Sequence, residues 1–432
     1  MKKDILRTKM LSIIVLVLAL LFTVSGIDAA AASKQVTLRF GAWMVSAWVE
    51  PFQAIISDFE KSHPNIKVKF EYAPFAQYWE QLQTAVAAGT APDVTLMSVA
   101  YLIDFAKRGA IVKLQPYVDR DLKTSDYYIF GDNRYPDKEK GELYSIPIHW
   151  VSKVLYYNKN LFDKEGVNYP TNDWGWDDLL AAAKKLTKDT NGDGKVDQWG
   201  FLVDTGFVEN FIWQNNGEIL NKDFTKCLLD EPAAREAVQF LHDLIYKHKV
   251  SPPLARASSG GQAEVLEDMF QTGKAAMSIN GSWMIGMYRD IKAFKWDIAF
   301  LPKGKRRAVY AGPDSLAILS SSKHKEEAWE FIKHFLKPES QRILAKYGTG
   351  TPVLKSIARS KEFLDSELPP EHMNVIPDQF PYIHRSYFSS KWFEWISAMT
   401  SELDLAFMNK KPIDQALKDA TAKVDAILAT TR

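Results

Sequence analysis

An acidic, glycine-rich segment near the middle of the chain carries the residue types of a calcium-binding loop. It reads Asp189-Thr-Asn-Gly-Asp-Gly-Lys-Val-Asp197. Oxygen-bearing side chains fall at loop positions 1, 3, 5 and 9, and glycine stands at position 6, where the sharp turn requires it. The predicted ligands are Asp189, Asn191, Asp193 and Asp197 through their side chains and Lys195 through its backbone carbonyl.

Position 12 of this loop is Gly200 instead of the usual bidentate glutamate. The loss removes two ligand oxygens, so we expect at most weak binding of a structural calcium ion and no required cofactor. A metal-free loop, closed by hydrogen bonds from backbone amides to Asp and Asn side chains, is an equal alternative.

Sequence motifs of catalysis are absent. The chain has no Gly-x-Ser-x-Gly, His-Glu-x-x-His, Gly-x-x-x-x-Gly-Lys-Ser/Thr or Cys-x-x-Cys, which are the signatures of common hydrolase, metalloprotease, nucleotide-binding and redox sites. A glycosidase needs only two suitably spaced carboxylates, and no sequence pattern excludes those.

Residues 1–32 have the three parts of a secretory signal peptide. Four basic residues lie between positions 2 and 9, Leu11–Val24 is uncharged and apolar, and Ala29–Ala32 supplies small residues for cleavage. The apolar run is shorter than the roughly 20 residues of a membrane span, and no cysteine stands at the cleavage site for a lipid anchor. We therefore expect an exported periplasmic protein without stable membrane insertion, with extracellular secretion as the alternative.

Composition narrows the class further. Removing residues 1–32 takes away four basic and two acidic residues, which leaves 50 Lys+Arg and 51 Asp+Glu. This balance gives no reason to expect a nucleic-acid partner. About 400 residues exceed the size at which one hydrophobic core keeps growing, so two domains are expected. The single cysteine, Cys227, cannot form an internal disulfide and is predicted to be packed.

The hydrophobic pattern predicts parallel strands alternating with helices. Strands are expected over Val36–Phe40, Ile66–Tyr72 and Val94–Met97, and helical spacing of apolar residues connects them. Right-handed crossovers would join these elements into an open, doubly wound α/β sheet.

Aromatic residues are numerous, with 13 Trp and 17 Tyr. The C–H faces of pyranose rings pack on aromatic planes, and sugar hydroxyls need polar partners in a pre-formed cleft. Large aromatic residues also fill protein cores, so position must decide between the two roles. Trp43 follows a strand and a glycine, and in open α/β sheets such strand ends face the ligand crevice.

Separate blocks of the sequence resemble the extracellular sugar-binding proteins of ABC importers, the maltose-binding type of solute-binding protein. These blocks are the stretch Gly141–Phe201, Ala91-Pro-Asp-Val94, Gly109–Pro116, Tyr156-Tyr-Asn-Lys159, Phe270–Trp283, Ile298–Gly304, Ala311–Leu316 and Lys325–Phe331. Each block alone is a weak signal, and their order along the chain makes the resemblance specific.

The resemblance implies an α/β fold of two lobes, the class II periplasmic-binding-protein type, with each lobe a doubly wound sheet flanked by helices and a ligand cleft between them. The N-terminal lobe is predicted to comprise residues 33–148 and 292–346, and the C-terminal lobe 149–291 and 347–432. Three crossing segments are predicted near residues 147–153, 284–292 and 346–353.

The resemblance and the strand-end argument together give the predicted ligand-binding residues. They are Trp43, Ser98, Tyr101, His149, Trp150, Trp213, Asn215, Trp283, Asp314 and Trp392. Several of them keep a structural alternative. A lone histidine such as His149 is more often a packed or hydrogen-bonding residue than a ligand contact. Asp314 could cap a turn, and Trp392 could pack in a helix contact with Trp395, because a spacing of three puts both on one helical face.

The implied function is capture of a carbohydrate, most simply an oligosaccharide, and its delivery to the transmembrane subunits of an ABC permease. We expect a monomeric binding protein and not an enzyme. The alternatives are a secreted carbohydrate-active enzyme and a binding protein for a polyol or a glycerophosphate-type solute.

Overall fold

The computed structural model describes residues 35–129, 133–137, 139–255, 262–364, 367–384, 387, 389 and 391–430. The predicted signal peptide lies outside these ranges. None of the helices within them combines the length and the apolar composition that a membrane span needs.

Two lobes are built from separate sets of elements. The first contains β1 (Val36–Trp43), β2 (Ile66–Ala73), β3 (Val94–Ser98), α2 (Ser46–Ser62), α3 (Phe75–Ala87), α4 (Val99–Lys107), α5 (Gln115–Asp121), α12 (Lys325–Leu336) and α13 (Pro338–Tyr347). The second contains α6 (Lys159–Lys164), α7 (Trp176–Leu186), α8 (Val208–Gln214), α9 (Pro232–Tyr246), α10 (Gln262–Gln271), β7 (Met277–Gly281), α11 (Ile285–Tyr288), β8 (Trp296–Ala299), α17 (Trp392–Phe407) and α18 (Ile413–Ala429).

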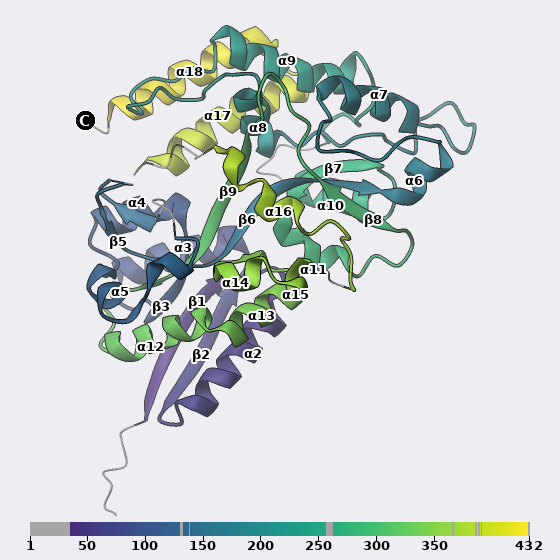
Figure 1. Cartoon of the computed structure of the whole chain (residues 1–432). Coiled ribbons are helices and arrows are strands. Elements are labelled where there is room, and N and C mark those ends of the chain that lie inside the picture. Colours follow the sequence, from purple (N-terminus) through teal and green to yellow (C-terminus); the bar gives the residue numbers. More distant parts are fainter. Residues whose placement is uncertain are drawn as a thin grey trace, which may run out of the picture.

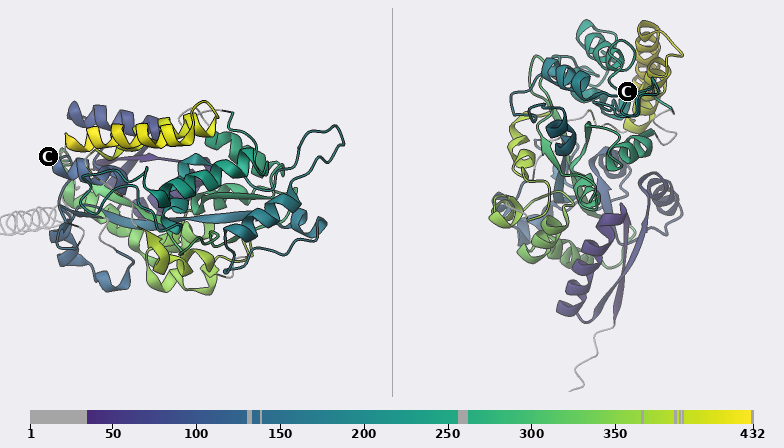
Figure 2. Two further views of the ribbon diagram at one scale, coloured as in Figure 1. Left: turned by 90° about the horizontal axis from the view of Figure 1, so that it is seen from above. Right: turned by 90° about the vertical axis from the view of Figure 1, so that its right-hand side faces the viewer.

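Two long strands, β6 (Ile146–Asn158) and β9 (Val309–Ile318), run between the lobes. Short elements complete the chain: η1 (Thr124–Asp126), β4 (Arg134–Tyr135), β5 (Glu142–Leu143), η3 (Thr205–Phe207), η5 (Ser282–Met284), β10 (Thr351–Pro352), α14 (Lys355–Ala358), α15 (Lys361–Leu364), α16 (Val375–Asp378), η6 (Phe380–Tyr382) and β11 (Ile383–His384). Figure 1 shows the purple strands of the first lobe below and the teal and yellow helices of the second above, and Figure 2 (right) shows the same separation from the side.

The sheet of the first lobe begins with the predicted βαβ unit. Strand β1 pairs in parallel with β2 and β3, and β3 then pairs antiparallel with β9. The predicted apolar stripe of α2, which includes Phe52, Ile55 and Phe59, is buried. The two-lobe α/β fold class predicted from the sequence is confirmed, with the difference that the crossing strands run antiparallel to their neighbours.

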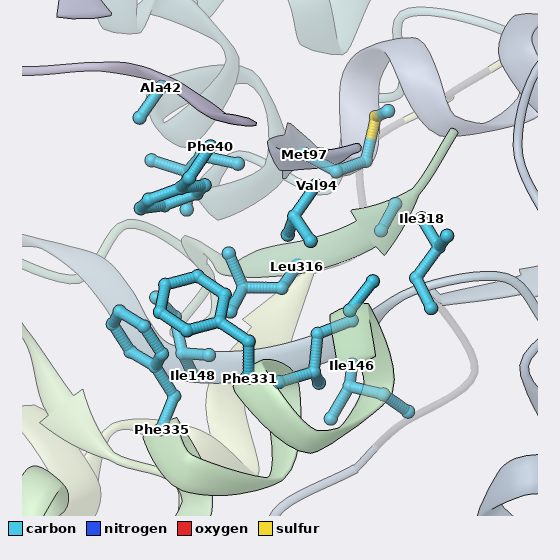
Figure 3. Packing of buried hydrophobic residues seen from close by; sticks show 14 of the residues in the cluster. Phe40, Ala42, Val94, Met97, Ile146, Ile148, Leu316, Ile318, Phe331 and Phe335 are labelled. Carbon is cyan, nitrogen blue, oxygen red and sulfur yellow. The ribbon is translucent and has the colours of Figure 1, made fainter. Parts of the chain in front are cut away.

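The core of the first lobe is centred on Phe40 of β1 (Figure 3). Its ring lies 5.2 Å from that of Phe331 and 6.2 Å from that of Phe335, both on α12. Ile148 and Leu316, from β6 and β9, belong to the same cluster. A segment that lies in sequence between two parts of the second lobe therefore closes the core of the first.

Strand β6 changes sheets along its length. Its first half, Ile146–Ser152, pairs antiparallel with β9, whereas Lys153–Asn158 pairs antiparallel with β7 and then with β8. The backbone N–H of Ser152 also donates to Ser282 Oγ at 3.2 Å. The predicted first crossing, residues 147–153, thus lies inside one continuous strand.

The remaining crossings are seen in the packing of the hydrophobic clusters. The hydrophobic clusters of the second lobe include Trp296, Ile298, Leu301 and Val309. The sequence analysis had assigned residues 292–346 to the N-terminal lobe, so the chain returns to that lobe later than predicted. The chain re-enters the first cluster at Ala311 in β9. The third passage follows α13, where β10 pairs antiparallel with His149 and Trp150 of β6.

Cys227 is fully buried in the cluster of the second lobe, as predicted. Desolvation raises the pKa of its thiol to about 11.

The buried side chain of Gln341 joins three passages of the chain. Its Nε2 donates to Ile148 O at 2.9 Å and to Phe335 O at 2.8 Å, while its Oε1 accepts from Val353 N at 2.8 Å. We expect Gln341→Ala to lower the free energy of unfolding by about 3 kcal/mol, because it leaves several buried backbone groups without partners. Urea denaturation measures this. The exposed Gln415, which donates to Asp419, provides the control: Gln415→Ala should cost under about 0.5 kcal/mol.

A buried histidine should make the first lobe sensitive to acid. Burial, with a smaller effect of Lys337, lowers the pKa of His334, whose Nε2 lies 3.1 Å from Asp58 Oδ2. The unfolded chain then binds more protons than the folded one below the ordinary histidine pKa of about 6.5, so stability is complete above that pH and falls as the pH drops. Urea midpoints of the wild type between pH 7.5 and 5 should decline more steeply than those of His334→Gln. Parallel declines would contradict this prediction.

Candidate functional site

Several aromatic side chains lie where the hydrophobic clusters meet. Trp283, Tyr310 and Trp392 are partly buried, and each packs against the cluster of the first lobe and against a second-lobe cluster. Trp283 follows β7, Tyr310 is on β9, and Trp392 begins α17. Two of the three, Trp283 and Trp392, are among the residues predicted from the sequence.

The first-lobe wall of this junction is an aromatic stack. Tyr101 on α4 lies parallel to Trp79 with ring centroids 3.8 Å apart, and Trp79 in turn lies 5.4 Å from Trp43 at the end of β1. Burial raises the pKa of the Tyr101 hydroxyl to about 12. Phe75, which is 47% exposed, extends the stack towards solvent.

A pocket of about 500 Å³ lies between α4 of the first lobe and the start of α17 of the second. Tyr101 faces it from one side, and its ring lies 6.4 Å from Trp392 and 6.1 Å from Phe393 on the other. Charged side chains surround these rings: Asp104, Lys107, Arg108, Lys391 and Glu394. The pocket therefore offers aromatic planes with hydrogen-bonding groups around them, contributed by both lobes.

His149 and Asp314 meet between the two crossing strands. His149 Nε2 lies 3.0 Å from Asp314 Oδ2, and its Nδ1 lies 3.4 Å from Thr349 Oγ1. His149 is fully buried, whereas the Asp314 side chain keeps 13% of its surface exposed. Ser98, opposite Asp314 in the strand pairing, accepts a hydrogen bond from Ala100 N and so caps α4. These residues tie β3, β6 and β9 together at the base of the junction.

A lysine that sequence reasoning missed enters the junction from β6. Lys153 is 3% exposed, and its Nζ lies 3.3 Å from the ring centroid of Phe207 and 3.9 Å from that of Trp283. Desolvation lowers the pKa of Lys153 to about 7, although Glu209, Asp204 and Glu267 oppose this shift.

The carboxyl groups near Lys153 are partly buried. Desolvation raises the pKa of Glu209 to about 7 and shifts the pKa of Asp204 and of Glu267 upward. Glu267 accepts a hydrogen bond from Asn280, next to Gly281. A side chain at Gly281 would place its Cβ 2.1 Å from the Trp283 ring, so glycine allows the tryptophan to fold back against the strand.

Three other predicted ligand residues have partners inside the lobes. Trp150 donates from Nε1 to Tyr128 O at 2.8 Å. Trp213 is fully buried, stacks on His384 at 4.3 Å and donates to Tyr387 Oη. Asn215 donates to Ala233 O and to Glu236 Oε2. These contacts give each residue a structural role, and their contact with ligand stays a prediction.

The acidic loop is closed by its own backbone. Asp189 accepts from Gly192 N at 2.6 Å and Gly194 N at 2.7 Å, and Asp193 accepts from Lys195 N. Asp197 accepts from Thr190, mainly through the backbone N–H, and this lowers its pKa. The metal-free alternative accounts for these bonds, and calcium binding stays a prediction.

Metal-ligating side chains gather elsewhere in the described ranges. The described residues contain one set of three metal-ligating side chains whose ligand atoms lie within 4.8 Å of one another, and it consists of Asp297, Glu371 and His372. Asp297 already accepts from His372 Nδ1 at 2.6 Å, and Glu371 pairs with Lys159. Protein partners thus satisfy these carboxylates.

Comparison with known proteins agrees with this architecture. Residues 45–342 match the model of the family described as bacterial extracellular solute-binding protein. The chain is 28% identical over 390 residues to a putative binding protein of Brucella abortus, covering 87% of this chain and 89% of that protein. It is 27% identical to the arabinooligosaccharide-binding protein of Halalkalibacterium halodurans, covering 66% of this chain and 64% of that protein.

A similar solved structure covers nearly the whole molecule. The ABC substrate-binding protein of Listeria monocytogenes in complex with cycloalternan superimposes with a TM-score of 0.82 at 27% identity, covering 92% of this chain and 99% of that one. The family match and the two-lobe fold agree, and the chain belongs to the bacterial extracellular solute-binding proteins.

Proposed function

We propose that this protein is the solute-binding component of an ABC sugar importer and that it captures an oligosaccharide between its two lobes. The observation that carries the proposal is the junction itself. Aromatic planes from both lobes, Tyr101 from α4 with Trp392 and Phe393 from α17, face one pocket rimmed by charged side chains. This is the combination that a sugar requires, since its C–H faces pack on rings and its hydroxyls need hydrogen-bonding partners.

The relatives support a saccharide of more than one unit. One solved relative is in complex with cycloalternan, and one curated relative is named for arabinooligosaccharides. A pocket of about 500 Å³ lies within the range of small-molecule sites. Trp283, which is partly buried, would extend the binding surface beyond this pocket, whereas the predicted Trp43 is only 6% exposed and belongs to the core of the first lobe.

The lobe arrangement suggests how capture works. The lobes are joined by β6, by β9 and by the passage after α13, so a change in the twist of a few residues can alter their separation. Ligand that contacts both lobes favours the closed arrangement only by its extra affinity for that state. The closed form would be the one that the permease subunits recognise.

Further parts of the proposal concern setting and chemistry. The protein acts outside the cytoplasmic membrane as a monomer, in the periplasm or as a secreted protein. It holds its ligand without breaking it. The partly buried carboxyl groups around Lys153 are then hydrogen-bonding partners of sugar hydroxyls and not catalytic groups.

A thermal-shift screen tests the proposal. The purified chain without residues 1–32 is heated with mono- and oligosaccharides, polyols and glycerophosphodiesters, and ligand binding to the folded state raises the melting temperature by mass action. We expect a rise of several degrees with an oligosaccharide and unchanged sugar on chromatography after prolonged incubation. Sugar breakdown would favour the enzyme alternative. A rise in melting temperature with polyols or glycerophosphodiesters alone would mean that one of these, and not an oligosaccharide, is the ligand.

Phe393 offers a substitution with little structural cost, because its side chain is 61% exposed. We expect Phe393→Ala to leave the melting temperature of the free protein unchanged and to weaken binding of the sugar found in the screen about fivefold, the equivalent of about 1 kcal/mol for one ring contact. Calorimetric titration measures this. Tyr72, which is 53% exposed and does not line the pocket, gives the control Tyr72→Ala, which should bind like the wild type. Equal affinities for all three proteins would remove Phe393 from the site.

A further inference from the structure

The ammonium group of Lys153 lies in an unusual environment for a lysine. Its Nζ lies between the rings of Phe207 and Trp283, and the ring centroid of Tyr310 is 5.8 Å away. Only 3% of the residue is exposed to solvent. Within the described ranges, Nζ makes no hydrogen bond and no ion pair. Its three N–H donors therefore face aromatic rings, and no acceptor within the described ranges lies at hydrogen-bonding distance.

Burying such a group is costly, and folds usually compensate by pairing the charge. Cation–π contacts recover only about 2 kcal/mol even when desolvated, whereas an isolated buried ammonium loses several kcal/mol of hydration. Other buried charges of this protein follow the usual rule: Glu402, for example, receives both Lys411 and Lys423. The donors of Lys153 thus lack the acceptors that a structural role would provide.

The backbone of Lys153 is, by contrast, fixed on both sides. Its N-terminal neighbour Ser152 donates to Ser282, and its own carbonyl accepts from Gln379 Nε2 at 3.1 Å. Lys153 is also the first residue of β6 that pairs with β7, so it stands where the strand passes from one sheet to the next. The fold therefore places this ammonium at the lobe junction and holds it there.

Resting on the proposed function, we propose that Lys153 Nζ donates hydrogen bonds to hydroxyl oxygens of an uncharged sugar, and that the carboxyl groups around it exclude sugars that carry a carboxylate. The sugar ring would pack on Trp283 while its oxygens supply the acceptors that the protein lacks. The same contact would connect the ligand to the strand that joins the lobes.

The charge balance around Lys153 gives the second half of the proposal. Asp204, Glu209 and Glu267 act on Lys153 electrostatically, and Glu264 and Asp404 lie close enough to act on Asp204. Three carboxyl groups thus act on one ammonium. A carboxylated sugar would add negative charge to a partly buried site that has no further cation among these groups. A neutral sugar, whose hydroxyls both donate and accept, can bond to the lysine and to the carboxyl groups together.

The test compares Lys153→Met with the wild type by calorimetric titration and thermal melting. The probes are maltotriose, arabinotriose, mannobiose and galactotriose, with trigalacturonate as the carboxylated counterpart of galactotriose. Met keeps the length of the side chain and removes the charge and the donors. Lys355→Met is the control, because Lys355 lies over Tyr128 at 5.6 Å and is exposed.

We expect Lys153→Met to bind the panel sugar preferred by the wild type at least tenfold more weakly, while its melting temperature without ligand stays the same or rises. Lys355→Met should match the wild type in affinity. Trigalacturonate should bind the wild type at least tenfold more weakly than galactotriose or not detectably. A structural lysine would give the opposite pattern, a lower melting temperature with unchanged affinity.

Each failure has a distinct meaning. If the wild type binds none of the panel sugars, both the proposed function and this inference are overturned. If the affinity of Lys153→Met for the preferred sugar stays within twofold of the wild-type affinity, the inference alone is overturned. Tighter binding of trigalacturonate than of galactotriose overturns the selection against carboxylates. Should Lys153→Met fail to fold, ¹³Cε-labelled lysine spectra of the wild type decide: the lysine signal shifted by the two rings must move when the binding sugar is added, and an unmoved signal overturns the proposal.

Discussion

The structure depends on one strand that belongs to two sheets. Every residue of β6 is buried, its first half is bonded to β9 and its second half to β7 and β8. A strand in this position must satisfy its backbone groups in both lobes at once, because an unmade buried hydrogen bond costs about as much as a good one contributes. The relative position of the lobes is thus limited to what the twist of β6 and its neighbours allows. His149, Asp314 and Lys153 are all placed by this constraint.

Polar groups near this strand fall into two kinds. Gln341, His149 and Asp314 are satisfied by the protein and hold its segments in register. Lys153 is buried and the carboxyl groups near it are partly buried. Desolvation is the main cause of the lowered pKa of Lys153 and of the raised pKa values of these carboxyl groups. Groups of the first kind stabilise the fold, and groups of the second kind lower its stability unless something else bonds to them. Their concentration at the junction of two lobes is what one expects of a binding site.

The sequence indicated the fold well, because its signals are local. The alternation of Ile66, Val68 and Phe70 and the helical spacing of Phe52, Ile55 and Phe59 each determine an element and its buried face. The resemblance placed Trp283 and Trp392 close to the lobe junction, where both are found.

Neither signal could find the Lys153 group, since its members Phe207, Trp283 and Tyr310 come from three distant segments. The available hint was a lysine inside a largely apolar strand. Trp213 and Asn215 show the opposite case, because both have bonding partners within one lobe that local sequence does not reveal.

The burial of Cys227 has a practical consequence. Its thiol is inaccessible and its pKa of about 11 keeps it protonated at neutral pH, so it reacts slowly with maleimides and iodoacetamides. A cysteine introduced on the protein surface would then be the only readily labelled position. The natural chain can therefore carry a single environment-sensitive fluorophore at the rim of the pocket without prior removal of its own cysteine, which makes it a convenient scaffold for a reagentless optical sensor of its ligand.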